Sequence, residues 1–182
     1  MTCLVPITNG SDAMEAVIII DMMRRAGVDV TVAGDGHLIT CSKGVRIVPD
    51  TAIDDLGEYD DFDIIILPGG RQGVQNFLAN ESLRQLIVKH RNAKRPLAAI
   101  CAAPFVLHEL ELLKSGSKVT SHPTLEHEFT GYNYVTDRVV DENGIITSRG
   151  AGTAFEFALA IIKKYVDEGT ARWLSTDIVL YE

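Results

Sequence analysis

The chain has 182 residues, of which 46% are hydrophobic and 23% are charged. This length and apolar fraction fit one domain with a continuous core and exclude an intrinsically disordered protein. The formal net charge is −8, from 17 basic and 25 acidic residues, which argues against nucleic-acid binding. The apolar runs are too short to span a membrane, and residues 1–8 lack the pattern of a signal peptide.

The three cysteines, Cys3, Cys41 and Cys101, are far apart in the sequence and form no C-x-x-C pair. An odd number at such spacings argues against a disulfide framework and against a structural zinc site. We therefore expect a cytoplasmic protein with reduced thiols. Cys3 is interpreted as a core residue and Cys41 as a core or interface thiol, which leaves the reactivity of Cys101 as the open question.

Apolar patterns in the first half of the chain predict strands at Thr2–Ile7, Val28–Ala33 and Phe62–Leu67, a helix at Ala13–Ala26, and a hairpin of His37–Cys41 and Val45–Val48. The helix is expected to begin at an N-cap of Ser11 or Asp12 and to end at Gly27. Its inward stripe is predicted to contain Met14, Val17, Ile18, Met22 and Ala26. An acidic linker runs from Asp50 to Asp61.

The second half continues the alternation, with predicted helices at Ser82–Asn92, Pro104–Leu113 and Phe155–Tyr165, strands at Leu97–Ile100 and Ser117–Thr120, and a hairpin of Arg138–Asp141 and Gly144–Thr147. Continuous apolar runs such as Leu97–Ile100 are typical of strands that are buried on both faces. The pattern predicts a doubly wound α/β sandwich with a mostly parallel sheet, as a single domain over residues 1–182.

A functional site in such a sheet lies beyond the carboxyl ends of the strands. Four segments are therefore expected to converge: the loop before Glu15, the turn Pro68-Gly69-Gly70, the turn at Cys101 and the loop around His122. This expectation rests on topology alone.

Cys101 ends a buried strand and precedes a helix, with the small residues Ala102 and Ala103 between them. A nucleophile on a tight strand-to-helix turn is the arrangement of a nucleophile elbow, and the helix N-terminus is expected to favour the thiolate. Free cysteines are also among the most buried residue types, so a structural thiol explains the same local pattern. The local pattern alone leaves both interpretations open.

Three other segments carry groups suited to cysteine chemistry. The pair Gly69-Gly70 can turn backbone N–H groups toward an oxyanion, although a plain turn explains it as well. Glu15 lies in the first turn of a helix, where a solvated acid that favours the helix dipole is the simpler interpretation. His122 follows a predicted strand and is a candidate general base.

Other polar residues are assigned to the surface at this stage. Glu126, His127 and Glu128 match no zinc-ligand spacing and are interpreted as a solvated loop, so we predict no metal site. Arg25 and Arg149 are surface charges by default, although Arg149 beside a glycine can neutralise an anionic group.

Several longer motifs are specific as a set: Met14-Glu15, Asp21 to Gly27, Val30 to Ala33, Leu67 to Gly70, Ala98 to Pro104, His122-Pro123, Thr147 to Thr153 and Phe155 to Ala160. In this order they resemble the DJ-1/PfpI superfamily over nearly the whole chain, and within it the branch of DJ-1 and bacterial YajL. The resemblance implies a flavodoxin-like fold and a homodimer.

The resemblance also implies roles for the reactive centre. Cys101 corresponds to the oxidation-sensitive nucleophile, and Glu15 to a protonated carboxyl that hydrogen-bonds the thiolate or its sulfinate. The N–H groups of Gly70 and Ala102 correspond to the oxyanion site, and His122 to a nearby pocket histidine. By the same resemblance, Arg149 and Arg25 line an anionic pocket or the dimer edge.

Some positions depart from the family pattern. Ala102 follows Cys101 where protease and amidase relatives have a histidine, so a hydrolase triad is missing and we discount peptidase activity. Lys43 replaces a frequent arginine, Val48 replaces a cysteine, and Ala151 replaces a proline. Cys101 and Glu15 are unaffected by these departures.

The resemblance implies a glyoxalase III-type lyase (D-lactate dehydratase) or a deglycase that uses no cofactor and no glutathione. In this interpretation the thiolate of Cys101 adds to a 2-oxoaldehyde such as methylglyoxal, and Glu15 with His122 moves the proton. A second hypothesis is a peroxide sensor with a chaperone role, switched by oxidation of Cys101. A third is an interaction domain in which Cys101 is inert.

Overall fold

Seven strands form the central sheet of the computed structural model, which describes residues 1–57 and 61–180. Their order is β10-β11-β7-β6-β1-β2-β5, and all neighbours are parallel except β10 and β11. The strands are β1 Thr2–Ile7, β2 Asp29–Gly34, β5 Thr51–Ala52, β6 Ile64–Leu67, β7 Leu97–Ile100, β10 Val139–Glu142 and β11 Ile145–Ser148. The predicted, mostly parallel sheet is therefore confirmed.

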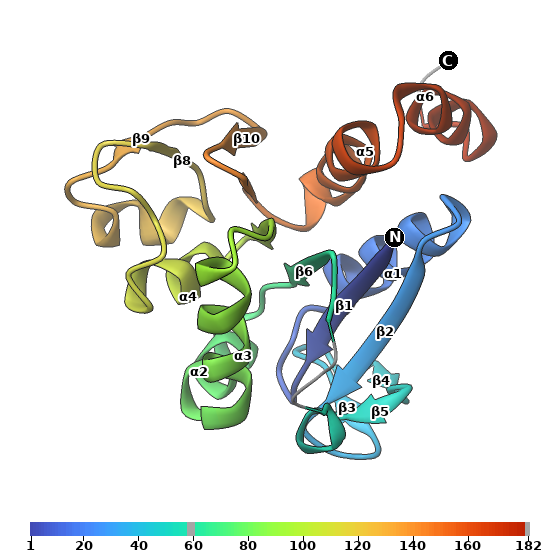
Figure 1. Ribbon diagram of the computed structural model, residues 1–182, viewed down its shortest axis with the longest axis horizontal. Helices are drawn as coiled ribbons and strands as arrows, with labels where there is room; N and C mark the ends of the chain where they lie inside the picture. Colours follow the sequence, from blue (N-terminus) through green and yellow to red (C-terminus); the bar gives the residue numbers. More distant parts are fainter. Residues whose placement is uncertain (58–60, 181–182) are drawn as a thin grey trace.

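Helices cover both faces of this sheet (Figure 1). One face carries α1 Ala13–Arg25, α5 Ala154–Tyr165 and α6 Glu168–Asp177. The other carries α2 Arg71–Ala79, α3 Glu81–Asn92 and α4 Pro104–Glu109. This is the doubly wound sandwich that the alternating sequence predicts, and it forms a single domain.

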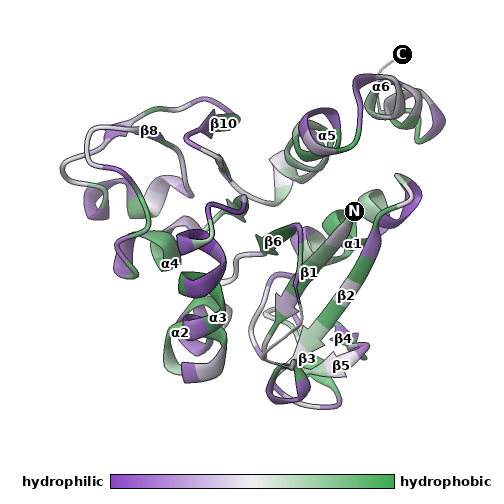
Figure 2. Ribbon diagram, viewed as in Figure 1, coloured by the Kyte–Doolittle hydropathy of each residue, from purple (hydrophilic) through white to green (hydrophobic). Residues whose placement is uncertain are grey.

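The middle strands β1, β6 and β7 are largely apolar because they are buried on both faces. In Figure 2, for example, β6 has the colour of hydrophobic residues. In β1, for example, Cys3, Val5 and Ile7 face the core under α1 and α5, whereas Leu4 faces the core under α2 and α3. The predicted core position of Cys3 is confirmed. Cys41 is also buried in this structure of a single chain, packed in the same core as Cys3.

Helix α1 begins at the N-cap Asp12 and is followed by Gly27 in a left-handed conformation, as predicted. Its predicted inward stripe is confirmed for Met22, which is buried, and for Ile18 and Ala26, which pack against the core. It is wrong for Met14 and Val17, which are 61% and 48% exposed. The buried face also contains Glu15, Ala16, Ile19 and Met23, so a carboxyl group points inward.

Some elements differ from the prediction. Helices α2 and α6 were not predicted, and α4 ends four residues earlier than expected, before Glu111 adopts a positive φ. The predicted strand at 117–120 pairs as β8 Lys118–Val119 with β9 Asn133–Tyr134, outside the central sheet. The acidic linker contains β5 and the 3-10 turn η1 Ile53–Asp55, and its residues 58–60 lie outside the described residues.

Both predicted hairpins are confirmed. Strands β3 Ile39–Thr40 and β4 Arg46–Ile47 pair antiparallel, as do β10 and β11. The first hairpin is tied to the loop before α1 by hydrogen bonds from Gly10 N to Thr40 O and from Ser42 N to Ser11 O, both 2.9 Å. Within the part of the chain that the structure describes, no helix has the length and apolar character needed to cross a membrane.

Candidate active site

A pocket of about 600 Å³ opens at the carboxyl ends of β6 and β7. The chain runs from β1 to β2 in one direction along the sheet and from β6 to β7 in the other, so the switch point of the topology lies between β1 and β6. Such a point is where doubly wound sheets bind ligands. The pocket is lined by residues from the predicted segments, among them Asp12, Gly70, Cys101 and His122.

Cys101 occupies the turn that leads from β7 toward α4. Its φ of 64° lies in the left-handed region, where a non-glycine residue is strained by roughly 1–3 kcal/mol. The backbone is fixed on both sides of the thiol: Cys101 N donates to Ser148 O at 2.9 Å, and Cys101 O accepts from His122 N at 2.7 Å. The half-buried side chain lines the pocket. These features are those of a nucleophile elbow.

Glu15 lies directly behind this thiol and is only 1% exposed. Its Oε2 accepts a hydrogen bond of 2.7 Å from Gly69 N, and its carboxyl group is hydrogen-bonded to the Cys101 thiol. A Cβ on Gly69 would lie 2.7 Å from both Glu15 Oε2 and Cys101 Cβ. Only glycine therefore leaves room for the contact between the carboxyl and the thiol.

The Glu15 carboxyl and the Cys101 thiol are neighbouring acidic groups, and each shifts the pKa of the other. Burial, together with the charge of Asp12, raises the pKa of Glu15 to about 7. Burial and the adjacent Glu15 raise the pKa of the Cys101 thiol, whereas the N–H groups of Ala102 and Gly70 lower it. The helix N-terminus was expected to favour the thiolate, but the pKa of the thiol is raised because burial and Glu15 outweigh the backbone N–H groups. A thiolate at Cys101 requires that Glu15 keeps its proton.

The turn Gly69-Gly70 supplies backbone donors rather than side chains. Gly70 has φ 95°, and a Cβ there would lie 2.3 Å from Gly10 O, so no other residue fits. In this conformation the N–H of Gly70, with that of Ala102, hydrogen-bonds the sulfur of Cys101. Two convergent N–H groups at a nucleophile are suited to stabilise an oxyanion formed there.

His122 lies on the pocket wall and is half-buried. It caps the 3-10 helix η2 Pro123–Glu128: its Nδ1 accepts a hydrogen bond from Thr124 N at 3.4 Å and lies 2.9 Å from Thr124 Oγ1. When Nδ1 acts as this acceptor, the neutral ring carries its hydrogen on Nε2. The structure thus brings Cys101, Glu15, Gly69, Gly70, Ala102 and His122 together at one end of the sheet.

The two predicted pocket arginines are placed elsewhere. Arg25 ends α1, far along the helix from Glu15, and pairs with Asp21 and Asp177. Arg149 does not line the pocket, and its guanidinium donates to Thr136 O at 2.9 Å. Neither side chain lines this pocket, because the resemblance fixes their positions in the chain but not the direction of these long side chains. Their alternative place at a dimer edge stays a prediction.

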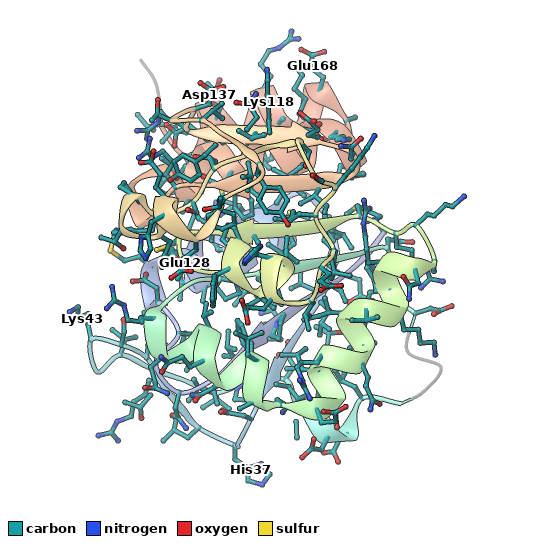
Figure 3. The ribbon with its side chains drawn as sticks, turned by 90° about the vertical axis from the view of Figure 1, so that its left-hand side faces the viewer. His37, Lys43, Lys118, Glu128, Asp137 and Glu168 are labelled. Carbon is teal, nitrogen blue, oxygen red and sulfur yellow. The ribbon has the colours of Figure 1, made fainter. Side chains whose placement is uncertain are left out.

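Other cations line the pocket instead. Lys43 comes from the β3–β4 loop and Arg71 from the start of α2, and neither has an ion-pair partner among the described residues. His127 and Glu128, assigned to a solvated loop from the sequence, also line the pocket and lie 3.1 Å apart. Lys43 and Glu128 are both found toward the left of the view in Figure 3. No group of three metal-ligating side chains occurs within residues 1–57 and 61–180.

The sequence reasoning also missed the apolar wall of the pocket, formed by Val74, Leu78, Phe105 and Leu125. Three of these residues lie on α2 and α4, and α2 was not predicted. A signal was present: Arg71 follows two glycines after a buried strand, and Val74 and Phe77 are spaced as one helix face.

Residues 1–164 match the sequence model of the DJ-1/PfpI family. The chain belongs to the DJ-1/PfpI family. Among solved structures, Drosophila melanogaster DJ-1beta superposes with a TM-score of 0.93 at 36% identity, covering 100% of this chain and 98% of that one. Toxoplasma gondii DJ-1, described as oxidized, superposes with a TM-score of 0.93 at 32% identity over 98% and 97% of the two chains.

Curated relatives in this family come from plants and animals. Protein DJ-1 homolog B of Arabidopsis thaliana is 40% identical over 164 residues, which are 89% of this chain but 37% of the plant protein. The Parkinson disease protein 7 homolog of Danio rerio is 36% identical over 184 residues, covering 97% and 96%. Glutathione-independent glyoxalase DJR-1.2 of Caenorhabditis elegans is 37% identical over 156 residues, covering 84% and 82%. The chain thus spans well under half of the plant relative and most of the animal ones.

Proposed function

We propose that this DJ-1/PfpI protein is a glutathione-independent glyoxalase that uses Cys101 to convert methylglyoxal and glyoxal into 2-hydroxy acids. One observation carries the proposal: a strained, accessible thiol is hydrogen-bonded to a buried carboxyl, Glu15, whose pKa is about 7. Such a pair places a nucleophile beside a proton donor in one pocket. The C. elegans relative named as a glutathione-independent glyoxalase supports the same activity.

The first step joins the substrate to the sulfur. The Cys101 thiolate adds to the aldehyde carbon of methylglyoxal, so a C–S bond forms and the carbonyl electron pair moves onto oxygen. The N–H groups of Gly70 and Ala102 stabilise this oxyanion, and Glu15 protonates it to give a hemithioacetal. The pocket geometry supports these roles, because all of these groups contact the sulfur or its carboxyl partner.

The second step moves one proton between adjacent carbons. The former aldehyde carbon loses its hydrogen as a proton to the Glu15 carboxylate or to His122, and the resulting enediol is protonated at the neighbouring carbon. The product is a thioester of lactate on Cys101. Water then breaks the C–S bond, so one methylglyoxal and one water give one lactate and the free thiol. The reaction uses only groups of the chain, with no cofactor.

The test is lactate formation from methylglyoxal without glutathione. We expect Cys101→Ala and Glu15→Ala to lose turnover by about 10³-fold or more, since the nucleophile or its proton partner is removed. Cys41→Ala is the matched control, because Cys41 is buried outside the pocket lining, and it should retain wild-type turnover. Equal disappearance of methylglyoxal in all four proteins would mean scavenging by lysine and arginine side chains and would refute the proposal.

The same pocket supports a deglycase activity on early glycation adducts of proteins and nucleotides. At about 600 Å³ it has far more room than a three-carbon aldehyde needs, and its apolar wall and the cations Lys43 and Arg71 can contact a larger adduct. Release of lactate from a thiol or amine adduct of methylglyoxal, at a rate above spontaneous decay, is the measurement that checks this extension.

A peroxide sensor with a chaperone role is the second candidate, favoured by the N–H groups that face the sulfur. Peroxide oxidises the thiolate of Cys101 to a sulfenate and a second peroxide gives the sulfinate, releasing one water each time. Gly70, Ala102 and a protonated Glu15 are placed to hydrogen-bond the sulfinate oxygens. Stoichiometric oxidation of Cys101 by peroxide, without catalytic lactate formation, would favour this role.

We further propose a cytoplasmic homodimer. The cytoplasmic location follows from the reduced-thiol composition. The dimer fits the outer face of α1, where Met14 and Val17 are large apolar side chains left exposed in the single chain.

A further inference from the structure

Asp12 is held rigidly beside the reactive pair. Its Oδ1 caps α1 by accepting from Glu15 N at 3.1 Å, and its own backbone N donates to Gly69 O at 2.9 Å. The N–H of the same residue, Gly69, donates to Glu15 Oε2 at 2.7 Å. Asp12 also lines the pocket that contains Cys101. The backbone of a single residue, Gly69, thus fixes Asp12 and Glu15 relative to each other.

The carboxylate of Asp12 acts unequally on the two members of the pair. Its charge raises the pKa of Glu15, to which it is linked through the first turn of α1. The groups that shift the pKa of Cys101 are instead burial, Glu15, and the N–H groups of Ala102 and Gly70. The negative charge of Asp12, which the N-cap contact holds next to Glu15, therefore opposes ionisation of Glu15 more than that of Cys101.

We propose that Asp12 is a positioning residue for the shared proton: its carboxylate favours the proton on Glu15 and so increases the fraction of the pair that carries its negative charge on the sulfur of Cys101. This deepens the proposed function and rests on the Cys101 and Glu15 roles given there. Beyond capping a helix, Asp12 then biases the balance between the two singly charged forms of the pair.

The proton count makes the role explicit. At low pH the pair holds two protons, one on sulfur and one on Glu15. Loss of one proton to solvent leaves either a thiolate beside a carboxylic acid or a thiol beside a carboxylate. Only the first form is nucleophilic, and the charge of Asp12 raises the energy of the second.

Other charged or titratable groups near the pair come from separate elements. They are Cys41 at the end of β3, Lys43 in the β3–β4 loop, Arg71 on α2, and His122, His127 and Glu128 around η2. Of these, Cys41 has a pKa raised by burial and by Asp12. None of them is among the groups that shift the pKa of Glu15, which are burial, Asp12, Cys101 and Gly69.

The test is the pH dependence of Cys101 alkylation by iodoacetamide, which reports the thiolate directly and needs no turnover. Asp12→Asn removes the charge but keeps the cap, since asparagine is an equally good N-cap residue. Asp167→Asn is the matched control: Asp167 caps α6 through Thr170 N at 2.7 Å and lies outside the pocket lining. Cys3 and Cys41 are replaced by alanine in all proteins so that only Cys101 reacts.

In wild type we expect the alkylation rate to rise with pH until Glu15 begins to lose its proton near pH 7, and then to flatten. In Asp12→Asn the flattening should begin at lower pH. The rate at pH 8 should fall about threefold to tenfold while the rate at pH 5 stays unchanged, because one pKa unit changes a proton equilibrium tenfold. Asp167→Asn should follow the wild-type profile.

Two results would overturn the proposal. One is an Asp12→Asn profile that coincides with wild type, and the other is an equal slowing at pH 5 and pH 8, which indicates a structural effect. Asp12→Asn is also combined with Glu15→Gln to show whether Asp12 acts through Glu15. The Glu15→Gln variant has no proton to share between the two groups. We expect no further change there, and a persistent loss would show that Asp12 does not act through Glu15. Because alkylation is independent of lactate formation, failure of the glyoxalase assay leaves this test intact.

Discussion

Glu15 is a carboxyl group that the fold buries almost completely and supports with only two neutral hydrogen-bond partners. Gly69 N donates to it, and the Cys101 thiol faces it, but no cation is among the groups that shift its pKa. Burial without a compensating positive charge favours the neutral acid, so its pKa rises from 4.5 to about 7. The folded protein thus keeps a proton that the unfolded chain releases, which is a linkage between pH and stability.

This linkage predicts how Glu15→Gln changes stability. Between pH 4.5 and 7 the folded state holds more protons than the unfolded state, so wild-type stability falls as pH rises through this window. The full difference corresponds to about 3 kcal/mol. The side chain of Glu15→Gln cannot ionise, so this variant does not lose stability as pH rises through the window. It should be more stable than wild type by about 1–3 kcal/mol at pH 8, with the gain shrinking toward pH 5, as measured by urea denaturation.

An equal effect at both pH values would contradict the raised pKa. Asp167→Asn serves as the control for a generic loss of charge, because Asp167 is exposed and its pKa is lowered rather than raised. That variant should show no stability gain that grows with pH.

Individual residues were predictable where the backbone dictates their surroundings. Cys101 and Gly70 follow from a strand end and a turn, whose positions are fixed by short apolar runs and glycines. Glu15 was placed beside Cys101 only by the family resemblance, because a solvated acid explains its local pattern more simply. Arg25 and Arg149 were misplaced because a long, flexible side chain reaches in a direction that chain position does not define. Lys43 and Arg71 line the pocket for the same reason and carried no local signal in the sequence.

Helix α1 shows how an element can be predicted in place but not in rotation. Its ends were correct, because Asp12 and Gly27 are strong local signals. The hydrophobic stripe was only partly correct, because Met22 is buried but Met14 and Val17 are exposed, and Glu15, a charged residue type, turns inward. A buried functional carboxyl breaks the rule that the apolar face is the inner one, so periodicity alone shifts the predicted inner face of such a helix.

Helix α2 packs against the loop before α1. The same loop contacts the turn Gly69-Gly70 of the site. Gly73 lies inside α2, where alanine would normally stabilise a helix by about 1 kcal/mol. A Cβ there would lie 2.8 Å from Ser11 Cα and Ser11 N, which are backbone atoms that cannot move alone. Gly73 O also accepts from Thr8 Oγ1 at 3.1 Å.

We therefore predict that Gly73→Ala destabilises the protein by about 1–3 kcal/mol, because the clash outweighs the gain in helix propensity. Thermal unfolding and Cys101 alkylation should both change, since the loop that carries Asp12 is displaced. Gly152→Ala is the control, because a Cβ there meets nothing within 4 Å, and it should behave as wild type. A stabilised Gly73→Ala variant would show that α2 does not hold this loop.

Across the whole molecule, the alternation of apolar runs predicted the sheet, its mostly parallel sense and the edge at which the site forms. The order of strands confirms this architecture, including the antiparallel β10 at one edge. Helix α2 was missed although Val74 and Phe77 are spaced as one helix face, and α6 was missed because most of its residues are polar or glycine. The parallel pairing of β8 and β9 outside the main sheet had no local signal either.

The proposed dimer is a property of the whole molecule. We predict that the wild-type protein sediments at micromolar concentration with twice its chain mass of 19.9 kDa. Val17→Lys, which places a charge on the exposed face of α1, should shift it to the monomer. Val179→Lys is the control, since Val179 is 66% exposed near the other end of the chain. A monomeric wild type in sedimentation would refute the dimer.

The most direct test of the proposed glyoxalase is the number of lactate molecules that each chain releases from excess methylglyoxal in the absence of glutathione. We predict that each chain releases many lactate molecules. Lactate release should be abolished when Cys101 is first blocked by iodoacetamide, and it should be retained when Cys41 is replaced by alanine. A yield of one lactate or fewer per chain, or release that survives alkylation of Cys101, would contradict it.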